Sequence, residues 1–305
     1  MGCLVGGFLA KSGQNVFFLD KDSGRARNIG RQGIRVEGVS GEFCVKGIKI
    51  ATEAKSIGRS ELIIITTKSY DTEEAIKLSR PLIDGRSRIM TLQNGLGNIE
   101  TINRYIPRAQ IIAGVTAEGA TLLAPGRIRH AGRGETIIGA VSGYRNPEAV
   151  DKLKEIADIF NRAGFGTKIT HDIIGLIWLK LIVNVGINSL TAITRLNNGR
   201  LVEFEGTREI MQAVVKEAVA VARKKKIKLT YSHPLEKVES VCRATAANVS
   251  SMLQDISRKK RTEIDFINGA IVREGKKLGI PTPVNSALTG LVKTIESSYT
   301  LQIVR

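Results

Sequence analysis

A row of polar side chains interrupts the otherwise apolar helical segment DIIGLIWLKLIVNVGINSLTAIT, at residues 172–194. The row is spaced by four, four and three positions and consists of Lys180, Asn184, Asn188 and Thr191. This spacing places all of its members along one face of a helix. An isolated buried lysine is costly, so we expect its ammonium to face a cleft, a partner or an anionic ligand. The alternative is that the lysine reaches solvent and that neighbouring loops satisfy the two asparagines.

A second polar row lies in the segment AANVSSMLQDI, where Asn248, Ser251 and Asp255 share a helical face. Glu263 follows in RTEIDFINGA, just before apolar periodicity resumes. We interpret these side chains as groups that could complete the site of the first row. The alternative is a capping pair of Thr262 and Glu263, with the other polar groups at the surface.

Two further polar residues stand at the ends of expected strands. Lys68 follows LIIITT at 62–67, and Asn94 lies in LQNGLGN, after RIMTL at 88–92. Ligands of doubly wound sheets bind at the carboxyl ends of their parallel strands. Both residues are therefore candidates for a ligand site, although NGLG could also be only a turn and the start of a helix.

The opening stretch, MGCLVGGFLAKSGQNVFFLD, indicates part of a dinucleotide-binding βαβ unit. A helix from Gly2 runs into a strand at 15–19 that ends at Asp20, the acidic position that faces a ribose in such units. Gly2 fits the third glycine of GxGxxG, which allows close packing of helix and strand. We therefore expect the first strand and two glycines, about 10 to 12 residues, upstream of an internal methionine, and weak cofactor binding without them. The alternative is an ordinary N-terminal amphipathic helix.

The elements before residue 171 alternate between short β-rich runs and helical patterns, which is typical of a parallel α/β sheet. The expected strands are 15–19, 62–67, 88–92, 110–117 and 165–169, with hairpin strands in the glycine-rich segment 124–140, and the expected helices are 71–79, 98–105 and 147–163.

From about His171 the pattern becomes all-α. The expected helices are 172–194, 209–225, 234–257, 263–278 and 285–302. The sequence thus predicts an N-terminally truncated dinucleotide-binding domain at 1–170 and a helical domain at 171–305 that carries the substrate and catalytic groups.

The composition is that of a globular protein, with 42% hydrophobic and 25% charged residues among 305. No apolar run approaches the roughly 20 residues that a membrane span requires, and no secretory signal is evident. The three cysteines, Cys3, Cys44 and Cys242, are far apart and lack CxxC spacing. This argues against a disulfide framework or a zinc site, so we expect the reducing cytoplasm and no metal.

The net charge of +17 could indicate nucleic acid, an anionic membrane or an anionic small substrate. The dense basic runs, RKKKIK at 223–228 and RKKR at 258–261, are short, and only 5% of residues are aromatic. Stacking platforms for single strands are therefore scarce. We interpret both runs as solvated basic faces and expect neither a nucleic-acid nor a membrane partner.

The motifs TLQNGLGNIE, WLKLIVNVGINSLTAI, ATAANVSSMLQDISRKKRTEIDFINGAIV and GIPTPVN occur in this order. With them the whole chain closely resembles the ketopantoate reductases (2-dehydropantoate 2-reductases). The resemblance implies a Rossmann domain followed by a helical domain like that of 6-phosphogluconate dehydrogenase, with the active site in the cleft between them. It also implies NADPH-dependent reduction of 2-dehydropantoate to pantoate, in pantothenate and coenzyme A biosynthesis. We expect a small keto acid as the partner and allow for a homodimer.

The resemblance also assigns roles to the candidate residues. It implies that Lys180 is catalytic and that Glu263 hydrogen-bonds the substrate hydroxyl. Asn94 would meet cofactor and substrate at its strand end, and Lys68 would lie near the cofactor. The implied substrate-binding residues are Asn184, Asn188, Asn248 and Ser251. The departure from the family pattern is the incomplete glycine loop, which puts cofactor binding by this exact chain in doubt.

The residue types agree with this chemistry. Hydride transfer to a ketone carbon drives negative charge onto the oxygen, and a positioned ammonium such as Lys180 can stabilise that charge and supply a proton. Burial would lower the lysine pKa and a substrate carboxylate would raise it, so the sequence leaves the direction open. Neutral Asn and Ser groups suit the orientation of a small polar keto acid.

The choice of nucleotide is ambiguous in the sequence. Asp20 favours the free 2′-hydroxyl of NAD, whereas Lys21, Arg25 and Arg27 could hold the 2′-phosphate of NADP. The family resemblance favours NADP. Two rivals to the whole interpretation remain, namely a reductase of another keto acid and a non-catalytic binding protein that lost its nucleotide loop.

Overall fold

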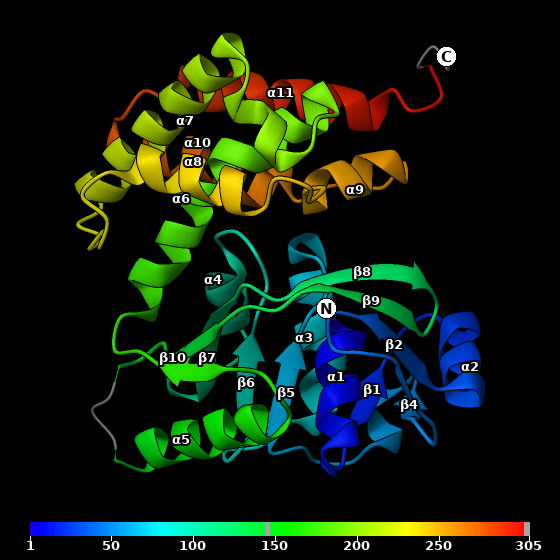
Figure 1. Cartoon of the computed structure of the whole chain (residues 1–305). Coiled ribbons are helices and arrows are strands. Elements are labelled where there is room, and N and C mark those ends of the chain that lie inside the picture. Colours follow the sequence, from blue (N-terminus) through cyan, green and yellow to red (C-terminus); the bar gives the residue numbers. More distant parts are fainter. Residues whose placement is uncertain (144–146, 302–305) are drawn as a thin grey trace. The chain divides into compact units, whose positions relative to one another are not determined.

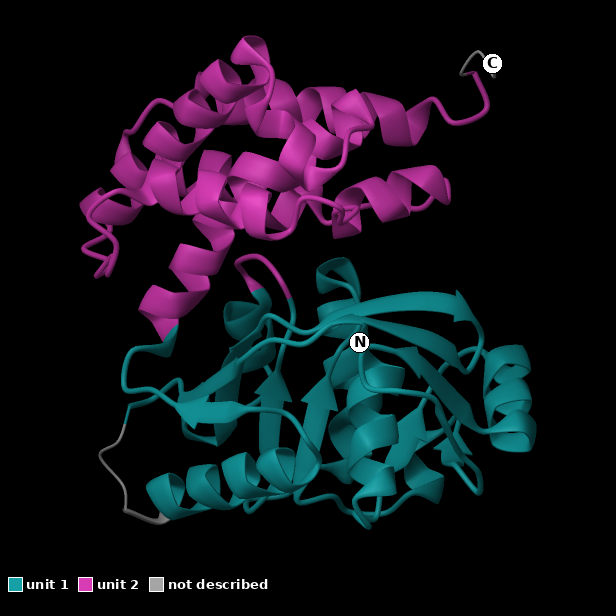
Figure 2. Cartoon of the chain, in the orientation of Figure 1, with its two compact units in different colours: residues 1–93, 98–173 teal, residues 94–97, 174–305 magenta. Residues whose placement is uncertain are grey.

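The computed structural model describes residues 1–143 and 147–301 and divides the chain into two compact units. Unit 1 comprises residues 1–93 and 98–173, and unit 2 comprises residues 94–97 together with the chain from residue 174 onward (Figure 2). Unit 1 is an α/β body, and unit 2 is helical (Figure 1). The loop 94–97 therefore belongs to the helical unit, although its flanking residues belong to unit 1.

Within the described residues, the largest sheet of unit 1 has five strands in the order β11-β10-β7-β6-β5. Its parallel part is formed by β5 (Leu62–Ile65), β6 (Arg88–Thr91) and β7 (Ile111–Thr116). β10 (Thr136–Ala140) pairs antiparallel to β7, and β11 (Thr167–Ile169) is parallel to β10. The sequence pattern had predicted a parallel sheet, whereas the sheet is mixed because β10 runs antiparallel to β7.

Three helices follow the strands of this sheet along the chain. They are α3 (Thr72–Ser79), α4 (Asn98–Asn103) and α5 (Pro147–Arg162), all close to the ranges that the sequence predicts. Short 3-10 turns connect the elements of unit 1 at Ala54–Ser56, Ser69–Asp71, Arg80–Leu82 and Arg108–Gln110.

The chain between the first strand and β5 contains elements that the sequence analysis did not predict. Here β1 (Phe17–Leu19) pairs in parallel with β4 (Lys49–Ala51). A separate sheet has the order β3-β2-β9-β8. It joins β2 (Ile34–Gly38) and β3 (Phe43–Val45) to two later strands, β8 (Gly119–Ala124) and β9 (Arg127–Gly132), and β9 lies in the segment 124–140 where hairpin strands were predicted. The helix α2 (Ser23–Gln32) precedes β2; Asp22 caps its start by accepting the Arg25 N–H, at 2.8 Å.

The helix α1 (Gly2–Lys11) lies close against its neighbours because it is rich in glycine. A Cβ at Gly6 would lie 2.3 Å from the Phe18 ring of β1, and one at Gly2 would lie 2.6 Å from Thr66 Oγ1, just after β5. In the common strand order 3-2-1-4-5-6, the first strand lies between the second and the fourth, which correspond here to β1 and β5. In the described residues no strand lies between β1 and β5 and pairs with both. The expectation of a strand upstream of Met1 remains a prediction.

Unit 2 is built from helices, in agreement with the all-α prediction. They are α6 (Ile173–Thr194), α7 (Glu205–Lys224), α8 (Pro234–Ala244), α9 (Ser251–Ser257), α10 (Asn268–Leu278) and α11 (Pro283–Ser297), with 3-10 turns η5 (Asn198–Val202) and η6 (Ile264–Phe266).

Two of the predicted helices were wrong in their continuity. The predicted helix 234–257 is divided into α8 and α9, because backbone N–H groups of Asn198 and Gly199 bond the carbonyls of Asn248 and Ala246. The predicted helix 263–278 starts as η6, and α10 begins only after Ile267, whose ψ of −96° is not helical. The predicted end of the last helix, Gln302, lies outside the described residues.

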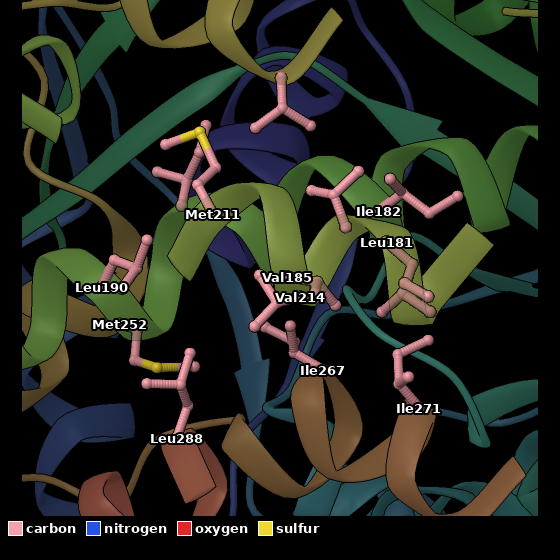
Figure 3. Packing of buried hydrophobic residues seen from close by; sticks show 14 of the residues in the cluster. Leu181, Ile182, Val185, Leu190, Met211, Val214, Met252, Ile267, Ile271 and Leu288 are labelled. Carbon is pink, nitrogen blue, oxygen red and sulfur yellow. The ribbon is translucent and has the colours of Figure 1, made fainter. Parts of the chain in front are cut away.

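The core of unit 2 forms where α6, α7, α10 and α11 meet (Figure 3). Side chains from α6 such as Val185 pack with Met211 and Val214 of α7, with Ile271 of α10 and with Leu288 of α11. All of these residues are buried. The apolar sides of α6 thus pack into the core, and the packing of this core does not account for the polar row on the same helix.

The helix α6 is long and apolar enough to span a membrane, with a mean hydropathy of 1.8 over its most apolar window. This corrects the expectation that no such run exists. In the structure 67% of that window is buried, as in the central helix of a globular domain.

A buried polar network joins three helices of unit 2. The Asn285 amide donates to Glu217 Oε2 at 2.7 Å and to the Val214 carbonyl at 3.1 Å, and its oxygen accepts from Asn268 Nδ2 at 3.0 Å. Glu217 also accepts the backbone N–H groups of Val284 and Asn285 at the start of α11. Asn285 of α11 therefore provides hydrogen-bond partners for buried polar groups of α7 and α10.

Replacing Asn285 with alanine is expected to lower the free energy of unfolding by about 3 kcal/mol, because it leaves buried polar partners unpaired. Urea unfolding monitored by circular dichroism measures this change. Ser286→Ala, at an exposed neighbouring position, is the matched control and should unfold like the wild type. Equal midpoints for the two variants would contradict this role of the network.

Candidate active site

The polar row of α6 occupies one face of the helix, as its spacing predicts. Asn188 and Thr191 are buried, and Lys180 and Asn184 are half-buried. In the described part of the chain the side-chain amides of Asn184 and Asn188 make no hydrogen bond with protein groups. Because amides out of full contact with water need partners, this pair is suited to a polar ligand.

Lys180 has an electrostatic partner in Glu263. Burial lowers the pKa of Lys180 to about 8, and the negative charge of Glu263 opposes this shift. Desolvation is thus the larger of these two effects and sets the direction of the shift, before any contribution from a substrate carboxylate. An ammonium with a pKa near neutrality can both donate a proton and stabilise a developing negative charge.

Glu263 is buried and stands immediately before η6. Its side chain makes no capping hydrogen bond to that turn. Thr262 Oγ1 instead accepts the Ile264 N–H at 3.1 Å. The capping alternative therefore applies to Thr262, and the carboxylate of Glu263 acts electrostatically on Lys180.

A hydroxyl pair connects the end of the α6 row to α9. Thr191 Oγ1 lies 2.6 Å from Ser250 Oγ, and Ser250 caps α9 by accepting the Leu253 N–H at 3.1 Å. Ser250 is buried, whereas the neighbouring predicted residues Ser251 and Asn248 are exposed. The sequence analysis missed Ser250, although a serine just before a helical run is a recognisable capping signal.

The loop 94–97 brings Asn94 into unit 2. The Leu96 N–H donates to the Phe266 carbonyl at 2.9 Å. Gly95 has a φ of 81°, and a Cβ there would lie 2.4 Å from the same carbonyl oxygen. Phe266 ends η6, three residues after Glu263, so this clamp holds Asn94 near the segment that carries the site carboxylate.

Two of the predicted cofactor residues, Gly2 and Lys68, lie near the start of α1 in unit 1. Gly2 contacts Thr66 closely, and Lys68 follows two residues later and is half-buried. Burial lowers the pKa of the Met1 amino group, and the charge of Lys68 adds to this effect while Cys3 opposes it. The start of α1 and the carboxyl end of β5 therefore lie within electrostatic range of each other.

Side chains that the sequence analysis missed hold the loops after β5 and β6. Gln93 Nε2 donates to the Thr67 carbonyl at 2.9 Å and to Thr72 Oγ1 at 2.8 Å. Thr72 Oγ1 in turn lies 2.8 Å from Asn98 Oδ1, and Asn98 donates to Ser69 Oγ at 3.2 Å. This network fixes the backbone on both sides of Lys68 and next to Asn94.

The charged residues after β1 are held in ion pairs, and Arg25 also lies 4.0 Å from Asp22 Oδ2. Arg25 binds Asp20 through two hydrogen bonds of 2.5 Å, and Lys21 binds Glu74 at 2.5 Å. Arg27, the remaining cation of the predicted set, lines a cavity of about 510 Å³ beside α2 and β4.

The cysteines and the acidic and histidine side chains bear on the prediction of no metal site and no disulfide. Among the described residues no group of three or more His, Cys, Asp or Glu side chains could hold a metal ion. Cys3, Cys44 and Cys242 are free thiols, and burial raises the pKa of Cys242 to about 11.

Comparison with known proteins places this geometry in a family. Residues 1–143 match "Ketopantoate reductase PanE/ApbA", and residues 172–296 match "Ketopantoate reductase PanE/ApbA C terminal". The chain belongs to the ketopantoate reductase family. Among its relatives, a 2-dehydropantoate 2-reductase of Pyrococcus horikoshii is 40% identical over 303 residues, which cover 97% of this chain and 95% of the relative.

Solved structures agree with the family fold. A ketopantoate reductase of Ralstonia eutropha superposes with a TM-score of 0.88 at 32% identity, covering 98% of this chain and 96% of the other. A D-mandelate dehydrogenase with NADH and anilino(oxo)acetate gives a TM-score of 0.89 at 28% identity, covering 99% and 97%. The fold prediction of a Rossmann-type α/β domain followed by a helical domain is thereby confirmed.

Proposed function

We propose that this member of the ketopantoate reductase family reduces 2-dehydropantoate to pantoate with a reduced nicotinamide nucleotide. The observation that carries the proposal is the half-buried ammonium of Lys180, with its pKa of about 8, in electrostatic contact with the buried carboxylate of Glu263. The names of the relatives, 2-dehydropantoate 2-reductases, support this substrate. Pantoate production would place the protein in pantothenate and coenzyme A biosynthesis in the cytoplasm.

The residues of unit 2 have distinct roles in this proposal. When bound, the nucleotide supplies a hydride to the ketone carbon, and the π electrons of the C=O bond move to oxygen. Lys180 stabilises that oxygen and donates a proton to it, which completes the hydroxyl. Glu263 accepts a hydrogen bond from this hydroxyl and keeps the lysine charged. The substrate is oriented by the neutral groups of Asn184, Asn188, Asn248 and Ser251.

Residues of unit 1 and of the loop 94–97 suit a dinucleotide. Gly2 lets the start of α1 approach Thr66 closely. The positive N-terminal end of a helix such as α1 favours binding of a pyrophosphate. Lys68 and Asn94 stand after β5 and β6, at the strand ends where such ligands bind. The family resemblance favours NADPH as the donor, whereas the solved complex of a D-mandelate dehydrogenase contains NADH. The proposed chemistry is the same with either nucleotide.

A keto acid assay tests the proposal against its nearest rival. Reduced-nucleotide oxidation is followed with 2-dehydropantoate, pyruvate and benzoylformate, the keto acid that corresponds to mandelate. A kcat/KM at least about tenfold higher for 2-dehydropantoate supports the proposal. Higher activity with benzoylformate would favour a reductase of another keto acid, and nucleotide binding without turnover of any of the three would favour the non-catalytic reading.

The pH dependence of kcat/KM is expected to follow Lys180. As the proton donor it must be charged, so log kcat/KM should be level below about pH 8 and fall about tenfold per pH unit above it. Glu263 raises this pKa, so Glu263→Gln should move the falling limb to lower pH. If the falling limb of the pH profile stays at the same pH in Glu263→Gln, then Glu263 does not influence the pKa of the proton donor.

A further inference from the structure

Asp20, at the carboxyl end of β1, has a carboxylate whose acceptor positions are nearly all used. Arg25 Nη2 and the Asp22 N–H both donate to its Oδ1, at 2.5 and 3.0 Å, and Arg25 Nε donates to its Oδ2 at 2.5 Å. An ionised carboxylate offers about four acceptor positions. One position, on Oδ2, is therefore left, and it suits a single hydroxyl donor.

The charge of Asp20 is maintained by its surroundings. Partial burial would raise the pKa of Asp20, but the hydrogen bonds from Arg25 and Asp22 and the charges of Arg25 and Lys21 outweigh it and lower the pKa. The carboxylate is therefore ionised at neutral pH. It also acts on Cys3 at the start of α1, where it helps burial to raise the thiol pKa. Asp20 thus lies within electrostatic range of the helix start that suits a pyrophosphate.

The cations nearest to Asp20 are already paired. Lys21 binds Glu74 and Arg25 binds Asp20, and the charges of Asp22 and Asp71 also act on these cations. Arg27, the third cation of the predicted set, lies on α2 and lines the cavity beside β4. A 2′-phosphate, which brings a charge of about −1.5 to −2, would have to displace a carboxylate from Lys21 or Arg25, so it is disfavoured beside them.

We propose that Asp20, fixed by Arg25, selects NADH over NADPH by accepting a hydrogen bond from the free ribose 2′-hydroxyl. This inference rests on the proposed function for its nucleotide site, and it reverses the preference that the family resemblance suggested. Arg25 is then a positioning residue for Asp20, rather than a ligand of a 2′-phosphate.

Calorimetric titration of the full chain with NADH and NADPH, without any keto acid, tests the selection by affinity alone. We expect NADH to bind at least about tenfold more tightly, the discrimination that one hydrogen bond to a charged group provides. In Asp20→Ala the NADH affinity should fall by about tenfold or more while the NADPH affinity rises. Titration with ADP and 2′,5′-ADP should show the same preference without the nicotinamide.

Two variants control for charge and for Arg25. Glu74→Gln removes a nearby negative charge without touching Asp20, so it should leave the NADH affinity within about twofold of the wild type. Arg25→Ala should weaken NADH binding and leave NADPH no weaker. A preference for NADPH that is lost in Arg25→Ala or Arg27→Ala would overturn the proposal. Failure to turn over 2-dehydropantoate, with the NADH preference intact, would instead count against the proposed function alone.

Discussion

Replacing Lys180 with alanine is expected to lower kcat for keto acid reduction by about a thousandfold, with the nucleotide Kd nearly unchanged. The ammonium combines two effects that each depend on its position, namely proton donation and stabilisation of the oxygen. Its depressed pKa of about 8 shows that the fold holds the lysine at a cost in solvation. Such a cost is typical of functional sites. Single-turnover kinetics and nucleotide titration measure the two quantities separately.

A second variant separates catalysis from folding. Lys180→Met keeps most of the side-chain volume, and although it removes the positive partner of the buried Glu263 carboxylate, circular dichroism should show that the helices remain. Its turnover should fall as in Lys180→Ala. Lys276→Ala, at an exposed lysine of α10, is the control and should have wild-type turnover. Normal turnover in Lys180→Met would remove the lysine from the mechanism.

The elements that the sequence predicted well are those with a strong apolar signal. The helix α6 and the strands β5, β6 and β7 are nearly continuous apolar runs, and each lies within two residues of its predicted bounds. The helix α2 was missed although both of its ends carry local signals, Asp22 as the N-cap and Gly33, with a φ of 82°, at the end. Its short, arginine-rich sequence has only two buried residues and therefore a weak apolar pattern.

Other differences could not have been read from local sequence. The break between α8 and α9 has neither proline nor glycine, and it is produced by backbone hydrogen bonds to η5, about fifty residues earlier in the chain. The same limit applies to the site. Spacing along α6 predicted its polar row, but the selection of Ser250 as the partner of Thr191 depends on how two helices pack. Tertiary contacts of this kind override local propensity.

Pairing of charges was the other property that the sequence could not supply. Lys21 and Arg25 were counted as candidate ligands of a 2′-phosphate because of their charge and nearness to Asp20. In the structure Arg25 is bound by the carboxylate of Asp20, and Lys21 is bound by that of Glu74, which is 53 positions away in the sequence. The residues alone left the choice between NAD and NADP open, and the family resemblance favoured NADP. The ion pairs are the observation from which the proposed selection of NADH is argued.

Replacing Gly95 with alanine is expected to lower kcat/KM by about a hundredfold, because the loop 94–97 would have to leave η6. A Cβ at position 95 would lie 2.4 Å from the Phe266 carbonyl oxygen and 2.9 Å from its carbon, and neither backbone atom can give way easily. Asn94 would move with the loop, and displacement of a site group by about 1 Å can cost this much. Steady-state kinetics measure the loss, and circular dichroism checks that the helices remain.

Gly97→Ala is the matched control within the same loop. Gly97 also has a positive φ, of 101°, so alanine is strained at both positions. The nearest atom to a Cβ at position 97 is Phe266 Cδ1, at 3.9 Å, which is ordinary contact. The difference between the two variants therefore isolates the contact with the Phe266 carbonyl from backbone strain. If both variants lost the same activity, strain alone would explain the effect, and the clamp that holds Asn94 beside the Glu263 segment would have no part in the reaction.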